Sequence, residues 1–288
     1  MITGLDPPIV GELVYCDHNF LITLRDSANR YQESVRKAVM AGRVSFVLSL
    51  WSLVEVARAT DDLKMAGLAA VIDGLRCGWL PERRWLQHHE VATRFFEYLN
   101  VPYPRPSPVR NLGQVAAELC GTAIPSAIQF AAFLRANMGP IEEAFANNAK
   151  ARTTTTRAWK QGWMEANSQV VSREYVATLL PSRTPAGLEI SEGLRREFLK
   201  QLNLEQFPSV AVEHAILDEN LRTGASLSEQ SFLDNQHGIT ALPYVEAVVS
   251  DDLRFTRMVN RVAPQLPFPV GRMITRQTFD REYLDYCE

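Results

Sequence analysis

The first sixty residues alternate between short apolar runs and longer stretches with helical periodicity. Residues 12–16 (ELVYC) and 44–48 (VSFVL) are rich in β-branched and aromatic side chains, which is typical of buried strands. Helical periodicity runs between them from about residue 20 to 40, and a second helix is expected from about Ser49 onward. This order favours right-handed βαβ units and a parallel sheet.

The middle of the chain has a different pattern, with helical periodicity and almost no sign of strands. Alternating prolines at residues 101–108 predict an extended connection, and helical patterns follow at about 113–180 and 191–201. We therefore expect an all-helical insertion into an α/β core.

The C-terminal part returns to the α/β pattern. Helices are expected at 208–221, 231–242 and 254–262, and strands at 247–249 and 272–275. The expected organisation has three parts: residues 10–84 and 208–288 as the two halves of one α/β core, and residues 85–207 as the helical insertion.

Composition limits the functions that this chain can have. Thirty Lys and Arg against 33 Asp and Glu give a formal charge of -3 over 288 residues, so a general attraction for nucleic acid is absent. Four scattered cysteines and five dispersed histidines favour reduced thiols in a reducing compartment over a zinc cluster. Neither a signal-peptide pattern nor a long apolar run is present, so we expect a cytoplasmic protein without a membrane contact.

Acidic residues follow the expected strands where a parallel sheet binds its ligands. Asp17 follows the first strand, and Asp251 and Asp252 follow the strand at 247–249. Glu55 lies in the helix after the second strand, and Asp234 in the helix that precedes the later one. Carboxylates gathered in this way repel each other unless a cation neutralises them. An all-oxygen site suits Mg²⁺ or Mn²⁺, which serve in phosphodiester hydrolysis.

Four segments in this order resemble the motif of PIN (PilT N-terminus-like) domains: residues 14–19 (VYCDHN), residues 52–55 (SLVE), Asp234 and residues 241–252 (ALPYVEAVVSDD). The LPY triplet is similar to larger bacterial PIN-like proteins with helical insertions. The resemblance covers the two ends of the chain and not the insertion. It implies a three-layer α/β/α sandwich around a parallel sheet, a Mg²⁺ or Mn²⁺ ion, and endonucleolytic cleavage of RNA.

The same resemblance implies a role for each acid. Asp17 would be the central metal ligand, and Glu55 and Asp234 would complete its surroundings. The last ligand is Asp252 by analogy with compact members of the family, or Asp251 by analogy with larger ones. The chemistry implied is attack by a metal-activated water in line with the leaving oxygen.

Two polar residues beside the acids would support them. By the same resemblance Ser250 would hydrogen-bond to the site, and Asn19 would steady Asp17. His237, one helical turn after Asp234, could share the crevice, although a structural role is the favoured interpretation.

Simpler interpretations exist for every acid. Asp17 and Asp252 stand where a helix N-cap is expected, and Glu55 and Asp234 could be ordinary helix-surface residues. Basic side chains at 150–163, mixed with aromatic ones, and Arg254, Arg257 and Arg261 could contact phosphates or be solvated.

Other enzyme classes lack their motifs in this chain. No glycine-rich dinucleotide or phosphate loop and no G-x-S-x-G occurs, and Asn19 stands where a haloacid-dehalogenase phosphatase needs a second Asp. The alternative from another class is a catalytically silent PIN-like protein that binds nucleic acid or regulates a partner. RNA is the expected substrate, a homodimer follows by analogy alone, and nothing in the sequence supports an antitoxin partner.

Overall fold

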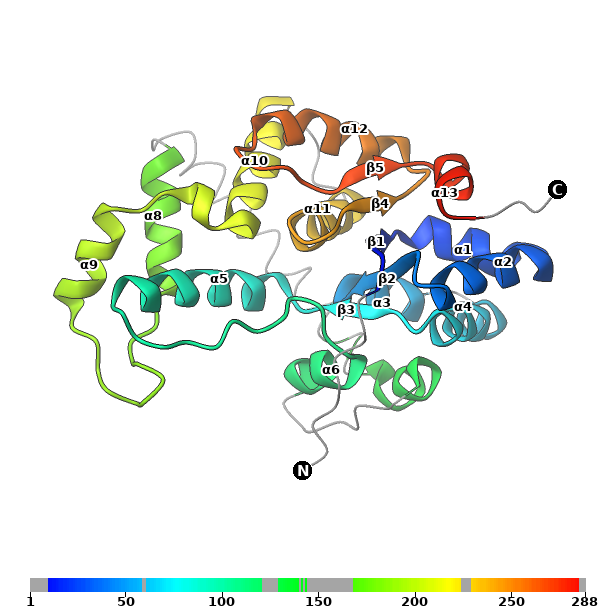
Figure 1. Cartoon of the computed structure of the whole chain (residues 1–288), viewed down its shortest axis with the longest axis horizontal. Coiled ribbons are helices and arrows are strands. Elements are labelled where there is room, and N and C mark those ends of the chain that lie inside the picture. Colours follow the sequence, from blue (N-terminus) through cyan, green and yellow to red (C-terminus); the bar gives the residue numbers. More distant parts are fainter. Residues whose placement is uncertain are drawn as a thin grey trace.

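The computed structural model describes residues 10–58, 61–120, 129–139, 141, 143, 168–223 and 229–284. Within them the chain forms one five-stranded, all-parallel sheet flanked by helices (Figure 1). The strands are β1 (Glu12–Cys16), β2 (Val44–Ser49), β3 (Gly78–Leu80), β4 (Ala247–Val249) and β5 (Arg272–Ile274). The α/β class and the parallel sheet expected from the sequence are confirmed.

Twelve helices with defined bounds accompany the sheet in the described ranges, together with a helical stretch at 130–139. They are α1 (His18–Asp26), α2 (Asn29–Met40), α3 (Leu50–Ala57), α4 (Asp62–Leu75), α5 (Arg83–Tyr98), α6 (Leu112–Cys120), α8 (Ser168–Leu179), α9 (Glu192–Lys200), α10 (Pro208–Thr223), α11 (Glu229–Ala241), α12 (Leu253–Val262) and α13 (Arg276–Tyr283). None of the helices that the structure describes is long and apolar enough to cross a bilayer.

The strand order is β3-β2-β1-β4-β5, so the chain winds outward from β1 in both directions. β1 pairs with β2 on one side and with β4 on the other, and Cys16 is in register with Val249. The order therefore reverses between β1 and β4. In open α/β sheets the crevice that binds ligands lies beyond the carboxyl ends of the strands at such a switch point.

Alternating side chains of the strands build a separate hydrophobic core on each face of the sheet. Val14 and Phe46 belong to the core covered by α1, α2, α4, α6 and α13, whereas Tyr15 and Val248 belong to the core covered by α10, α11 and α12. Helices on both faces of a parallel sheet agree with the three-layer α/β/α arrangement.

The helical middle of the chain divides between two cores. Residues 112–141 contribute Leu112, Phe133 and others to the core beneath α1 and α4. Helices α5, α8 and α9 pack with α10 around a third cluster that includes Phe95, Phe198 and Phe207. Figure 1 shows α8 and α9 at the end of the molecule away from α2 and α13. The basic and aromatic residues at 150–163 lie outside the described residues.

Replacing Gly11 with alanine is expected to destabilise the fold by roughly 2 kcal/mol or more. Gly11 has a φ of 79°, and an added Cβ would overlap the carbonyl oxygen of Gly42 and lie 2.6 Å from that of Arg43. Urea unfolding measures the loss. Gly187→Ala is the matched control, because Gly187 also has a positive φ but open space around it. Equal losses in the two variants would show that the backbone overlap at Gly11 contributes nothing.

Candidate functional site

Two polar residues meet across the switch point. Asp17 follows β1 and Ser250 follows β4, and the Ser250 hydroxyl donates a hydrogen bond of 2.7 Å to Asp17 Oδ2. The backbone holds both residues in place, since Asp17 N donates to Val249 O at 3.2 Å and Ser250 N to Ile274 O at 3.0 Å. The resemblance to PIN domains implies a hydrogen bond from Ser250 to the site, and the Ser250 hydroxyl bonds to Asp17.

Asp17 occupies the N-cap position of α1 but does not cap the helix. Its side chain makes no capping hydrogen bond, whereas the N-cap side chains of Ser49, Asp61 and Asp252 accept one or more from their helices. The carboxylate is 7% exposed. A buried acid without a capping role needs another explanation, and the charged side chains of Glu55 and His237, which act on it, supply one.

Burial, and after it the negative charge of Glu55, raises the pKa of Asp17 from its ordinary value of 3.8 to about 6, although His237 and Ser250 act in the opposite direction. The contribution of Glu55 means that these two carboxylates lie within electrostatic range of each other. The mutual repulsion that the sequence implied is therefore present in the fold.

Glu55 reaches the crevice from α3 and faces His237 on α11. The two helices contact each other beyond the end of β2, and Glu55 Oε2 lies 3.1 Å from His237 Nε2 with both side chains nearly inaccessible. Burial opposes charge on both groups, but their attraction outweighs it, lowering the pKa of Glu55 and raising the pKa of His237. The two side chains therefore form a buried ion pair.

The contact between Glu55 and His237 is close. Glu55 Oε2 and His237 Nε2 are both buried, and neither has another hydrogen-bond partner in the described residues. The contact is an ion pair at hydrogen-bonding distance, and attraction between the two charges, with a hydrogen bond at the margin of good geometry, shifts both pKa values. A carboxylate has about four lone-pair sites, so Glu55 can face His237 and still accept a further ligand.

Tyr15 and two serines fix the orientation of the His237 ring. The Tyr15 hydroxyl contacts His237 Nδ1 and lies 2.9 Å from Ser49 Oγ and 3.2 Å from Ser52 Oγ. A protonated imidazole donates from both nitrogens, so Tyr15 accepts from Nδ1 and donates to a serine. Sequence reasoning missed Tyr15, Ser49 and Ser52. The signal that could have found Tyr15 was a polar hydroxyl in the strand that ends just before Asp17.

Asp234 lies beside this group and has its own cation. Its carboxylate is 2.6 Å from the guanidinium of Arg254, whose side chain is half exposed. Asp234 is buried and its charge contributes to the raised pKa of His237, which places it near the pair. Glu55 thus contacts His237, and the charges of Asp17 and Asp234 both act on the pKa of His237.

The other three residues of the predicted site lie at its margin. Asp252 caps α12 by accepting from the backbone of Arg254 at 2.7 Å and of Phe255 at 3.0 Å. Asp251 is exposed and accepts from the backbone of Arg276 at 3.1 Å. Asn19 is exposed in the first turn of α1. For Asp252 the capping role seen from the sequence is realised, and the choice between Asp251 and Asp252 as a metal ligand stays open.

The side chains in the crevice fit a small, hydrated cation better than a metal held by protein ligands alone. Among the side chains that the structure describes, no three His, Cys, Asp or Glu residues form a group that could hold a metal ion. Mg²⁺, however, usually keeps several waters and takes one or two carboxylates. Asp17 and Glu55, whose negative charges act on each other, supply such a pair.

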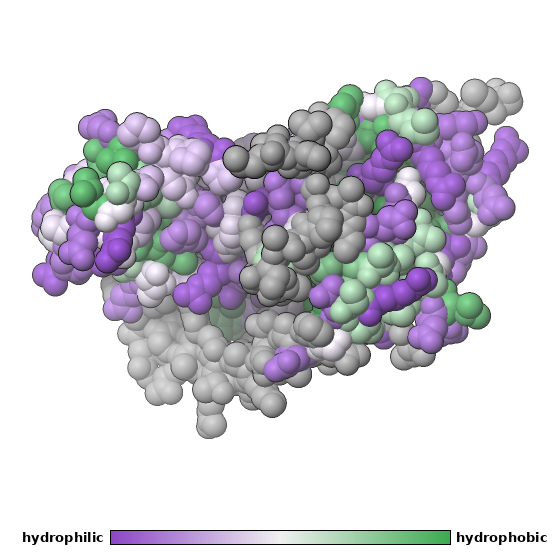
Figure 2. Space-filling view, turned by 90° about the horizontal axis from the view of Figure 1, so that it is seen from below, coloured by the Kyte–Doolittle hydropathy of each residue, from purple (hydrophilic) through white to green (hydrophobic). Residues whose placement is uncertain are grey.

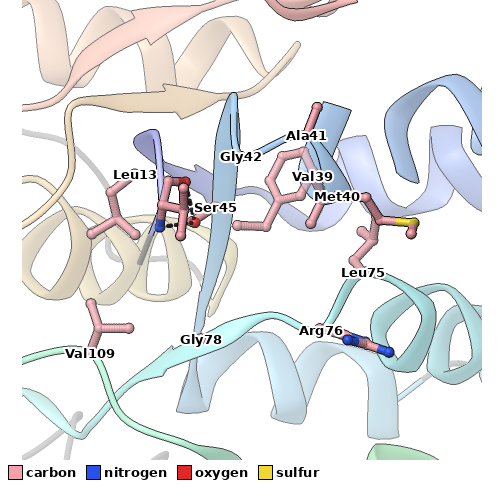
Figure 3. A pocket seen from close by; sticks show the side chains of 12 residues that line it. Leu13, Val39, Met40, Ala41, Gly42, Ser45, Leu75, Arg76, Gly78 and Val109 are labelled. Carbon is pink, nitrogen blue, oxygen red and sulfur yellow. Dashed lines mark hydrogen bonds between the residues drawn. The ribbon is translucent and has the colours of Figure 1, made fainter. Parts of the chain in front are cut away.

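A cavity of about 540 Å³ lies at the opposite end of the strands. Its lining is mostly apolar and comes from the beginnings of β1, β2 and β3 and the end of α2; Figure 3 shows Leu13 and Val109 on one side of β2 and Val39 and Met40 on the other. None of the predicted site residues lines it. The cavity thus lies at one end of the strands and the crevice expected from the strand topology at the other. We favour the carboxyl ends of the strands as the functional site because the buried charges converge there.

Fold and site together define an α/β protein whose acids converge at the switch point of a parallel sheet. No protein-family model, no curated protein and no solved structure matches the chain. The resemblance to PIN domains therefore depends on the residues of this chain.

Proposed function

We propose that this protein is a metal-dependent phosphodiester hydrolase, and within that class an endoribonuclease of the PIN type that uses Mg²⁺ or Mn²⁺. The observation that supports this is the pair of buried acids, Asp17 and Glu55, at the switch point. The pKa of Asp17 is raised and its side chain does not cap α1, and Glu55, which lies 3.1 Å from His237, is close enough for its negative charge to act on Asp17. Perturbed buried acids in a crevice are typical of functional sites.

Each residue of the crevice has its own role in the proposed reaction. Asp17 and Glu55 would hold the cation, which when bound supplies an activated water and neutralises charge on the phosphate. Ser250 orients Asp17 through its hydrogen bond. His237 holds Glu55, and Tyr15 fixes the His237 ring from the other side. Such supporting contacts keep ligands in a productive geometry.

The test is calorimetric titration of Mn²⁺ into metal-free protein, followed by cleavage of a single-stranded RNA with the same samples. We expect wild type to bind Mn²⁺ and cleave, and Asp17→Asn to lose more than about 100-fold in both, the upper end of what a supporting residue alone costs. Asp26→Asn is the matched control. It makes the same chemical change at an exposed residue, which pairs with Arg25 at the far end of α1. Unchanged cleavage by Asp17→Asn would contradict the assignment.

One observation favours a second candidate, a PIN-like protein that binds nucleic acid or regulates a partner without turnover. Glu55 and Asp234 already have protein cations, His237 and Arg254, so their charges are balanced without a metal. Under this alternative wild type would bind RNA, take up no Mn²⁺ and leave the RNA intact. The same titration and assay separate the two candidates.

A further inference from the structure

A groove with basic walls lies between α2 and α13. It encloses about 740 Å³, and among the described residues its charged lining is made of Arg30, Lys37, Arg43 and Glu33. Glu33 is also 4.0 Å from Arg36 on the same helix, which offsets part of its charge. The chain as a whole has a formal charge of -3. A local excess of positive charge on such a protein needs a reason of its own.

One residue that lines the groove is linked to the strand ends. Arg276 is the first residue of α13, and its backbone N–H donates to Asp251, next to Ser250. The Arg276 guanidinium lies 4.5 Å from the ring centroid of Tyr31, which lines the groove, and the Tyr31 hydroxyl donates to Asp280 on α13. Arg276 therefore connects the strand ends to the first turn of α2.

The groove follows α2 toward its C-terminal end. Arg30 is near the beginning of α2 and Lys37 is seven residues later, so the two lie on one face of the helix, about 10 Å apart along its axis. Both side chains are exposed. Arg43, Tyr283 and Leu284 line the far end. In Figure 2 the right-hand end of the molecule, where α2 lies in Figure 1, carries many strongly hydrophilic residues.

We propose that the α2–α13 groove binds the sugar-phosphate backbone of a single-stranded nucleic acid and leads it to the carboxylate crevice. Cations spaced along a groove can contact successive phosphates of a strand. A membrane would be met by cations on a convex face rather than in a groove. The proposal rests on the proposed function, since it names the path of that substrate.

The experiment measures binding of a fluorescently labelled single-stranded oligoribonucleotide in EDTA, so that no cleavage occurs. Arg30→Gln/Lys37→Gln removes two charges from exposed positions. Each phosphate contact on a single strand contributes about 0.7 to the slope of log affinity against log salt, so the slope is expected to fall by about 1.4. Arg30→Glu/Lys37→Glu should weaken binding further at every salt concentration.

Arg196→Gln/Lys200→Gln is the matched control. It removes the same charges from exposed positions on α9, which Figure 1 places at the other end of the molecule. Wild type and this control should bind alike. A groove variant that keeps the wild-type affinity and slope overturns the proposal, and so does a wild-type protein that does not bind the oligonucleotide. Binding to phosphatidylserine vesicles that the groove variant loses, with RNA binding unchanged, would overturn it in favour of a membrane.

The groove and the hydrolase can fail separately. Mn²⁺ titration of Arg30→Gln/Lys37→Gln should match wild type, because Asp17 and Glu55 are untouched. If RNA binding depends on the groove but the protein does not cleave, the proposed hydrolase function is wrong and the proposed binding groove stands. Cleavage by wild type with no effect of the groove variant on binding would do the reverse.

Discussion

Metal-free Asp17→Asn protein is expected to be more stable than wild type above about pH 7, and indistinguishable from it near pH 4. Burial, and then the charge of Glu55, raises the pKa of Asp17 from 3.8 to about 6 in the folded protein. Because the folded pKa is the higher one, the folded state favours the protonated acid. Its contribution to stability is present below the unfolded value and is lost as the pH rises through 6.

The size of this effect follows from the shift in pKa. One pKa unit corresponds to about 1.4 kcal/mol, so a rise from 3.8 to about 6 makes the ionised Asp17 cost on the order of 3 kcal/mol. Asn cannot ionise, yet it keeps an oxygen that accepts the hydrogen bond from Ser250. Asp17→Asn should therefore recover up to this amount at high pH.

Urea unfolding in EDTA, at about pH 4 and about pH 8, measures the difference. Asp26→Asn should show no gain at the higher pH, since Arg25 lowers the pKa of that exposed acid. An equal effect of Asp17→Asn at both pH values would mean that ionisation of Asp17 does not matter to the fold. The expected gain would mark Asp17 as a residue that lowers stability in the absence of a cation, as functional residues often do.

The sequence predicted the parts of the fold that repeat a local pattern. β1, β2 and β4 were found because each is a mostly apolar run, and the acids that follow β1 and β4 marked the ends of those two strands. β3 was missed, because Gly78–Leu80 is too short to show a period. The helix expected from 20 to 40 is broken at Ser27. Its backbone is extended, and its hydroxyl donates a hydrogen bond to the carbonyl oxygen of Thr23. No local pattern encodes that break.

The site shows the same limit at the level of single residues. Asp17, Glu55 and Asp234 could be chosen from the sequence because strand topology brings their elements to one edge. The position of His237 could not be predicted from the sequence, because it depends on how α11 packs across the end of β2 against α3. The spacing of His237 from Asp234 indicated that the two could share a crevice, but it did not indicate the ion pair with Glu55. Asp252 shows that a carboxylate at a strand end can simply cap the next helix.

Replacing His237 with alanine is expected to destabilise the protein by about 3–5 kcal/mol, the usual loss when one partner of a buried ion pair is removed. Glu55 would be left as a buried charge with no cation beside it, and Tyr15 would lose the ring nitrogen that its hydroxyl contacts. Urea unfolding at neutral pH measures the loss, which should shrink as the pH falls and Glu55 becomes protonated.

A double-mutant cycle with Glu55→Gln separates the ion pair from the loss of packing. Glu55→Gln removes the buried charge, so in that background His237→Ala should cost clearly less than it does alone. What remains is the cavity and the lost Tyr15 contact, which have no dependence on Glu55. If the two losses add, Glu55 and His237 do not interact in solution. In that case the 3.1 Å contact would not hold Glu55 in the crevice, and another group would have to balance its charge.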